Sequence, residues 1–289
     1  MNAGELGQAL ERAGYYAERD LTVTLFLALE LGRPLLVEGD PGVGKTEIAK
    51  ALARANNHPL IRLQCYEGLD ETKALYEWNY QRQLLKLQIR QGKETTDLES
   101  DLFSEEYLLE RPLLRAIRSR EKTVLLIDEV DKADAEFESF LFEVLSDFQV
   151  SIPELGTIPA VCVPAVILTS NAERELSEGL KRRCLYYHLE FPDVERETRI
   201  LRAKVPEVGE ALAREVALAA ACLRGLALRK KPSIAESLDW AKALGILGVT
   251  HLDEKAARDT IGVVLKNVGD WETIKEAGGI RRVVGAAVK

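Results

Sequence analysis

The sequence predicts an α/β fold in two parts: a parallel sheet with helices on both faces, followed by a small all-helical lid. Apolar stretches at 34–38, 123–129 and 164–171 have the composition of strands buried on both faces, and each ends in polar residues. From residue 194 onward alanine and leucine dominate at helical spacing, and no strand-like alternation remains. We therefore expect an α/β domain over residues 1–193 and a lid of four or five helices over 194–289.

The composition limits the class of protein. The 289 residues are 46% hydrophobic and 30% charged, with a formal net charge of −8. This acidic balance argues against a protein that binds nucleic acid through phosphate contacts, which favour a basic face. No apolar run reaches about 18 residues and no basic segment followed by an apolar run opens the chain, so we expect no membrane span, no signal peptide and a cytoplasmic location.

The stretch 37–46, VEGDPGVGKT, lies between the first strand and a helix expected at 47–54. Glycines let backbone N–H groups wrap a phosphate, the lysine reaches the β- and γ-phosphates, and the threonine hydroxyl takes a place on Mg²⁺. The N-terminus of the helix adds its positive dipole. We expect ATP and Mg²⁺ to bind here, at Gly39, Asp40, Pro41, Gly42, Val43, Gly44, Lys45 and Thr46.

Two acidic residues end the next buried strand. In Thr123–Glu129, four apolar residues precede Asp128 and Glu129, and ligands bind at the carboxyl ends of strands in open α/β sheets. Asp128 would hold Mg²⁺, partly through water and together with Thr46, whereas Glu129 would act as the general base toward the attacking water.

The remaining elements follow the same reasoning. A charged, mostly helical excursion is expected at about 69–112, with its most polar part at 91–104, and a β-hairpin at about 149–157. Amphipathic spacing predicts a helix at 136–148, a short helix at 176–183 and a last strand at 185–191. Tyr15 and Tyr16 precede a helix at 20–31 and are expected either against a nucleotide base or on the surface.

This order of motifs resembles an AAA+ ATPase. The excursion and the hairpin resemble the helix-2 insert and the pre-sensor-1 hairpin of the MoxR family, and strings such as LIRLQCYEGLD and KPSIAESLDWAKAL are similar to CoxD-like members. The resemblance implies that Asn171 is sensor 1 and that Arg183, with Arg182 as the alternative, is an arginine finger acting on the neighbouring subunit. Pro232–Glu236 stands where many members carry a sensor 2 arginine, and Lys230 or Lys231 would have to substitute for it.

The resemblance implies an ATP-hydrolysing chaperone that remodels a protein client. It associates the chain with maturation of a metalloenzyme of the molybdenum/copper carbon monoxide dehydrogenase type, with a hexameric ring, and with a von Willebrand A-type partner protein. The alternative is an AAA+ nucleic-acid motor or clamp-loader-like ATPase, against which the acidic charge argues. A GTPase would carry Asn-Lys-x-Asp, which does not occur.

Overall fold

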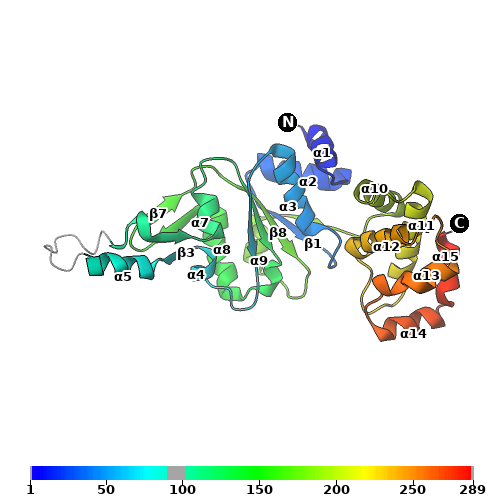
Figure 1. The fold of residues 1–289 in the computed structure, drawn as a ribbon. Helices are drawn as coiled ribbons and strands as arrows, with labels where there is room; N and C mark the ends of the chain where they lie inside the picture. Colours follow the sequence, from blue (N-terminus) through cyan, green and yellow to red (C-terminus); the bar gives the residue numbers. More distant parts are fainter. Residues whose placement is uncertain (1, 90–101, 288–289) are drawn as a thin grey trace. The chain divides into compact units, whose positions relative to one another are not determined.

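The computed structural model describes residues 2–89 and 102–287, and the described chain forms two units (Figure 1). Unit 1 contains most of residues 1–188, and unit 2 contains residues 189–289 together with the glycine-rich loop at 39–45 and residues 10–17. The loop therefore groups with the C-terminal unit, although the strand before it and most of the helix after it belong to unit 1.

A five-stranded parallel sheet forms the centre of unit 1, in the order β2-β5-β8-β1-β9. Each residue of the inner strand β5 is buried, as the unbroken apolar run at 124–127 predicts. This arrangement, with helices on both sides, confirms the predicted fold class. The strands are β1 (Leu35–Glu38), β2 (Leu60–Gln64), β5 (Val124–Asp128), β8 (Ala165–Ser170) and β9 (Leu185–His188).

Helices cover the sheet and complete one apolar core. α2 contacts β1 and β9, and α7 contacts β2 and β5. Side chains from the sheet, from α7 and from α8 share the core, among them Leu125, Leu113 and Leu141, each at most 1% exposed. The helices are α1 (Ala3–Arg12), α2 (Arg19–Glu30), α3 (Lys45–Asn56), α7 (Pro112–Ile117), α8 (Ala135–Asp147) and α9 (Glu178–Arg183), with a 3-10 turn η2 (Val130–Lys132) after β5.

Helical segments make up more than half of the described residues of the excursion between β2 and α7, as predicted, but the excursion also contains a β-ribbon that was not predicted. Its strands β3 (Tyr76–Trp78) and β4 (Leu108–Glu110) pair antiparallel, with α4 (Glu71–Ala74), α5 (Tyr80–Ile89) and η1 (Glu105–Tyr107) around them. Trp78 is 6% exposed and packs edge-on against Phe103 at 5.3 Å, so the ribbon has a small aromatic core. Most of the predicted polar stretch at 91–104 lies outside the described residues.

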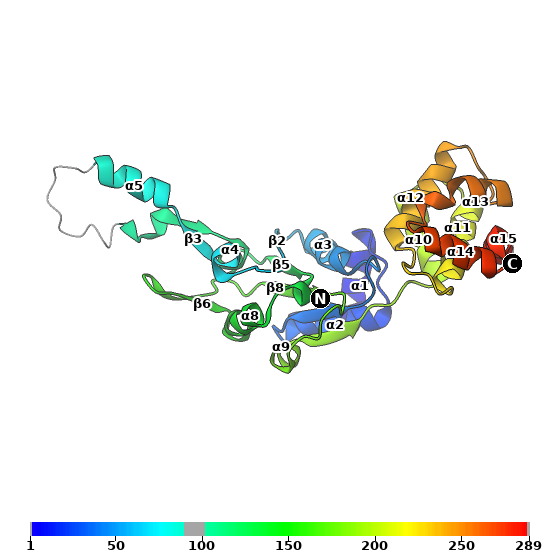
Figure 2. The same cartoon turned by 90° about the horizontal axis from the view of Figure 1, so that it is seen from below.

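An antiparallel hairpin, β6 (Gln149–Ile152) and β7 (Gly156–Pro159), follows α8. The hairpin and the β3–β4 ribbon extend from the same end of unit 1 (Figures 1 and 2). Ile152 is fully buried, whereas Leu155 and Ile158 are half-buried against the core of the unit. The apolar residues of the hairpin therefore contribute in large part to local packing.

Unit 2 contains six α-helices in its described residues, which corrects the expected four or five. They enclose a core around Trp240, which is fully buried and donates a hydrogen bond from Nε1 to Thr260 Oγ1 at 2.7 Å. The helices are α10 (Val194–Lys204), α11 (Glu210–Arg224), α12 (Ile234–Ile246), α13 (Glu254–Thr260), α14 (Val268–Glu276) and α15 (Gly279–Ala287), with η3 (Ile261–Val263) after α13. Within the described part of the chain, no helix has the length and apolar character needed to cross a membrane.

Candidate nucleotide site

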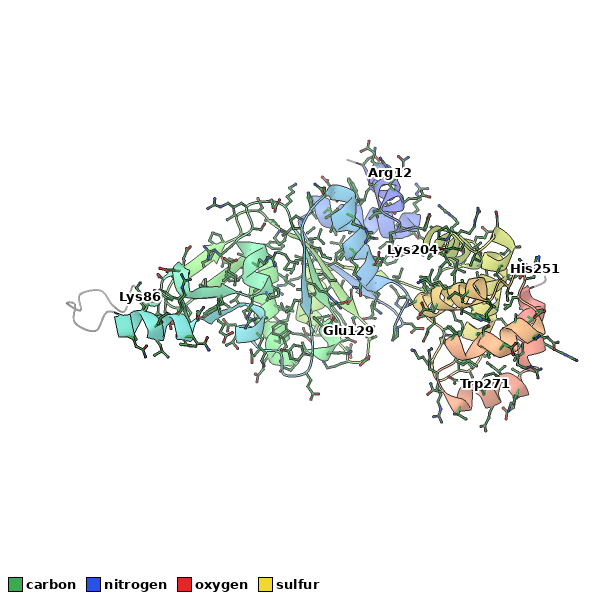
Figure 3. All side chains as sticks on the ribbon, viewed as in Figure 1. Arg12, Lys86, Glu129, Lys204, His251 and Trp271 are labelled. Atoms are coloured by element: carbon green, nitrogen blue, oxygen red, sulfur yellow. The ribbon has the colours of Figure 1, made fainter. Side chains whose placement is uncertain are left out.

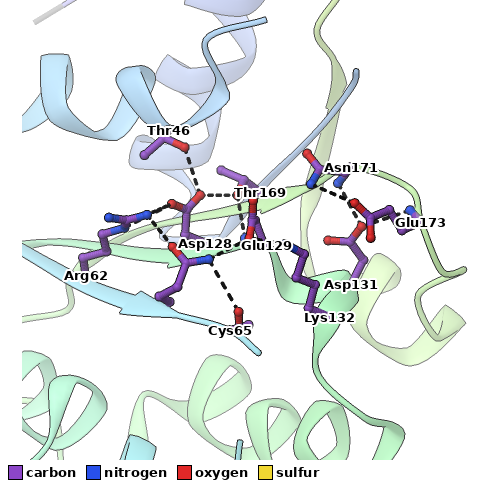
Figure 4. A network of polar contacts seen from close by, with 11 residues as sticks. Thr46, Arg62, Cys65, Asp128, Glu129, Asp131, Lys132, Thr169, Asn171 and Glu173 are labelled. Atoms are coloured by element: carbon purple, nitrogen blue, oxygen red, sulfur yellow. Dashed lines mark hydrogen bonds and ion pairs between the residues drawn. The ribbon is translucent and has the colours of Figure 1, made fainter. Parts of the chain in front are cut away.

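The carboxylate of Asp128 is held by three side chains at the carboxyl end of β5 (Figure 4). Its Oδ1 accepts hydrogen bonds from Thr169 Oγ1 at 2.6 Å and from Thr46 Oγ1 at 3.0 Å. Its Oδ2 accepts from Arg62, at 2.6 Å from Nη2 and 3.1 Å from Nε. Asp128 is 3% exposed, so these donors stabilise a carboxylate that has little access to water.

Glu129 has a left-handed backbone, with φ 56° and ψ 51°. A non-glycine residue there costs about 1–2 kcal/mol, and such strain concentrates at functional sites. Its Oε2 accepts hydrogen bonds from Gln64 Nε2 and from Lys132 Nζ, both at 2.8 Å. The bond to Glu129 raises the pKa of Lys132 above its ordinary value, so the lysine stays charged beside the carboxylate. The two donors fix where the carboxylate points.

The loop after β8 carries Asn171. Its backbone N–H, like that of Glu173, donates to Asp131 Oδ2 at 3.0 Å. Asp131 is 3% exposed and follows β5 in the chain. It therefore links the end of β5 to the loop after the neighbouring strand β8. Ala172 between them has φ 58°, a second left-handed residue in this network. The side-chain amide of Asn171 donates from Nδ2 to Glu173 Oε1 at 3.5 Å.

The glycine-rich loop has the backbone that its sequence predicts. Gly42 and Gly44 have φ of 81° and 99°, which side chains disfavour. A Cβ on Gly39 would lie 2.2 Å from the carbonyl oxygen of Leu189. Lys45, 6% exposed, donates from Nζ to the carbonyls of Gly39 at 2.6 Å and Asp40 at 3.0 Å. The loop therefore has the conformational freedom and the ammonium group that a phosphate cradle needs.

The residues present fit a nucleotide with a divalent cation. Thr46 and Asp128 supply a hydroxyl and a carboxylate in direct contact at 3.0 Å, and hard cations such as Mg²⁺ prefer oxygen ligands of this kind. Lys45 precedes Thr46 and opens α3, so the loop leads into a helix N-terminus.

The start of α12 packs on the same loop within unit 2. The N–H of Ile234 donates to the carbonyl of Gly42 at 3.2 Å, and a Cβ on Gly42 would meet Ser233 at 2.2 Å. Lys230 pairs with Glu236 at 2.9 Å, whereas Lys231 Nζ lies 3.9 Å from Asp40 Oδ2. Of the two lysines considered as a substitute for a sensor 2 arginine, Lys231 is thus the one beside the loop.

The two candidate finger arginines differ in their surroundings. The guanidinium of Arg183 bonds Ser146 Oγ, donates to the Gly179 carbonyl at 3.1 Å and lies 5.0 Å from the centre of the Phe142 ring. Arg182 is exposed, and in the described residues no hydrogen bond or ion pair engages its guanidinium. The structure therefore leaves Arg182 as the freer cation and holds Arg183 against α8.

Several residues of this network were not predicted from the sequence: Arg62, Gln64, Asp131, Lys132 and Thr169. A signal for two of them exists in β2, where Ile61 and Leu63 are buried and the alternate residues Arg62 and Gln64 share the opposite face. The pairing of β2 with β5 brings that face to Asp128.

A glycine-rich loop leading into a helix, with a buried strand ending in Asp-Glu, defines a P-loop nucleotide-binding domain. A family model described as an AAA domain of the dynein-related subfamily matches residues 34–184, more than half of the chain. The chain therefore belongs to this AAA family and carries an AAA-type ATPase domain.

Known proteins resemble the chain at low identity. An uncharacterized protein from Staphylococcus aureus is 27% identical over 171 residues, and the match covers 57% of this chain and 58% of that protein. One structure of a RuvB variant from Thermotoga maritima is 19% identical, with a TM-score of 0.52, and covers 95% of this chain and 77% of the other. A second is 17% identical, with a TM-score of 0.50, over 88% and 69%. At these identities the structural likeness concerns the fold alone.

Proposed function

We propose that the protein is a ring-forming AAA+ ATPase of the MoxR type that hydrolyses ATP with Mg²⁺ to remodel a protein client. The observation that carries the proposal is the network at the end of β5. There the buried Asp128 contacts the hydroxyl of Thr46, and Glu129 is oriented by Gln64 and Lys132.

Each side chain then has a defined task. Thr46 and Asp128, the latter partly through water, would hold Mg²⁺, which would supply positive charge to the transferring phosphoryl group. Lys45 binds the β- and γ-phosphates. Glu129 accepts the proton of the attacking water as general base, and Asn171 orients that water or contacts the γ-phosphate. The hydrogen bonds from Gln64 and Lys132 orient the Glu129 carboxylate for this step.

An arginine supplied by a neighbouring subunit would stabilise the transition state, which requires an oligomer, and we propose a hexamer. Arg183 is the first candidate by its place at the end of α9, and the exposure of Arg182 supports the second. Mixing Lys45→Ala with either arginine variant tests the shared site. Lys45→Ala alone and the variant of the finger arginine alone should be inactive, and mixed rings of the two should regain hydrolysis if that arginine acts in trans. Full activity of both arginine variants as dispersed monomers would contradict this.

The client is proposed as a metalloenzyme that awaits its cofactor, of the type served by CoxD-like members, and a von Willebrand A-type protein is the proposed partner. Support comes from the β3–β4 ribbon with α5 and from the β6–β7 hairpin, which nucleotide chemistry does not require. Deleting Pro153–Gly156 should leave basal ATP hydrolysis intact and abolish its stimulation by client. Loss of both would mean that the hairpin is structural.

The alternative of a nucleic-acid motor finds no support beyond the shared fold with RuvB and is opposed by the net charge of −8. Tight DNA binding that weakens steeply with salt would reverse this preference.

A further inference from the structure

A groove of about 740 Å³ lies at the end of unit 1 from which the ribbon and the hairpin extend. Its walls come from α4, β3 and the start of α5 on one side, and from α8, β6 and the turn after β6 on the other. Lys86 of α5 marks this end of the unit in Figure 3, well separated from Glu129. The groove is therefore distinct from the candidate nucleotide site.

The floor of the groove is apolar and fixed. Val144 and Val150 are each 1% exposed and Trp78 is 6% exposed. The ring of Tyr76, half-buried, packs edge-on against Trp78 at 6.0 Å. A floor of this kind binds aliphatic side chains by the hydrophobic effect without first having to rearrange.

The rim is acidic. Glu71, Glu77 and Glu154 line the groove, and among the described lining residues there is no lysine, arginine or histidine. Glu77 is paired with Arg111 at 2.5 Å, so its charge is already compensated. The pKa of the Tyr76 hydroxyl is raised first by burial and then by the charges of Glu154 and Glu71.

An exposed apolar row continues from the groove along α5. Tyr80 lines the groove and is 61% exposed, while Leu84 is 59% and Leu87 38% exposed. Residues at this spacing share one helix face, and seven residues of helix span about 10 Å. The combined surface is longer than a small molecule, and it suits an extended or helical segment of polypeptide.

We propose that this groove binds a segment of a protein client that combines apolar side chains with lysine or arginine. The apolar side chains would fill the floor over Val150 and Trp78. A cation would meet Glu154 and the faces of Tyr76 and Tyr80, since ammonium and guanidinium groups bind both carboxylates and aromatic rings. The carboxylates of the same rim would repel acidic peptide segments and the phosphates of nucleic acid. This proposal rests on the proposed function, because the bound segment belongs to the client that the ATPase remodels.

Binding of defined peptides to the full chain tests the proposal without nucleotide. The probe is a fluorescein-labelled twelve-residue peptide of Leu, Ser and Lys, followed by fluorescence anisotropy. Two matched peptides replace every Lys by Glu or every Leu by Ser. The Leu/Lys peptide should bind and both matched peptides should not. Equal binding of the Lys and Glu peptides would overturn the proposal, as would no binding of any.

Variants locate the site on the surface. Glu154→Lys removes the attraction between Glu154 and a lysine of the peptide and introduces a repulsion. The loss of one exposed ion pair and the gain of one exposed like-charge pair together should weaken binding roughly tenfold. Tyr80→Ser should also weaken it, whereas Glu121→Lys, an exposed reversal outside the groove, should not. Equal effects of Glu154→Lys and Glu121→Lys would mean non-specific attraction and refute the groove. If the chain self-associates and the peptide disrupts this association, the groove binds a second copy of the chain. That outcome would also refute the proposal.

The same variants separate this inference from the proposed function. Glu154→Lys and Tyr80→Ser should keep basal ATP hydrolysis while losing the peptide. A chain that binds the peptide but never hydrolyses ATP would contradict the proposed function and leave the groove supported. A chain that hydrolyses ATP and binds no peptide would support the ATPase activity and refute the groove.

Discussion

Replacing Arg62 by Met removes both donors to Oδ2 of Asp128. The Asp128 side chain is 4% exposed and that of Arg62 48%, so the carboxylate loses its partner in a place that water reaches poorly. A hydrogen bond to a charged group contributes about 1.5–3 kcal/mol. Since the arginine is half exposed, we lower the expected loss of unfolding free energy to about 1–2 kcal/mol.

Magnesium nucleotide should reduce this loss, because a divalent cation beside Asp128 supplies the positive charge that Arg62 provided. Urea unfolding of wild type and Arg62→Met, each with and without Mg²⁺ and ADP, measures both effects. Arg202→Met is the matched control, since its pair with Glu210 is exposed on both sides, 53% and 71%. The reasoning is refuted if, without ligand, Arg62→Met loses no more unfolding free energy than Arg202→Met. It is also refuted if Mg²⁺ and ADP leave the difference in unfolding free energy between wild type and Arg62→Met unchanged.

Three further outcomes follow from the same network and from the core. Gln64→Leu removes one donor to Glu129 and should lower kcat roughly ten- to hundredfold with nucleotide affinity retained, measured by steady-state hydrolysis and ADP binding; an unchanged kcat would contradict the role. Glu129→Gly should be more stable than Glu129→Ala by about 1 kcal/mol in urea, because glycine relieves the left-handed strain; equal stability would mean that the backbone relaxes. Burial raises the pKa of Cys65 and of Cys184 to about 12. Both therefore stay protonated at pH 8, and Ellman's reagent should modify them only after denaturation, whereas rapid modification of the native chain would exclude their burial.

The strands and the glycine-rich loop could be predicted because their signals are local. Residues 124–127 form an unbroken apolar run, and the Gly42 and Gly44 conformations follow from residue types at fixed spacing. The functional use of Arg62 and Gln64 could not be predicted in this way. It depends on the pairing of β2 with β5, which brings Arg62 to Asp128, 66 residues further along the chain.

Short elements escaped prediction for a different reason. β3 and β4 have three residues each, too few for alternation to be distinguished from a helical pattern, and their pairing is fixed by tertiary contacts such as the Trp78 packing. In the lid, Gly278 and Gly279 have φ of 109° and 72°, which separates α14 from α15. This break contributes to the count of six helices.

The central claim is that Glu129 is the general base of an ATP-hydrolysing site whose nucleotide is bound by the Lys45 loop. Single-turnover hydrolysis of labelled ATP by Glu129→Gln, with ATP affinity measured on the same sample, tests it most directly. Glutamine keeps the size of the side chain and loses its basicity, so affinity should stay near that of wild type while the rate falls roughly 10²–10⁴-fold. A wild-type rate in Glu129→Gln would contradict the assignment.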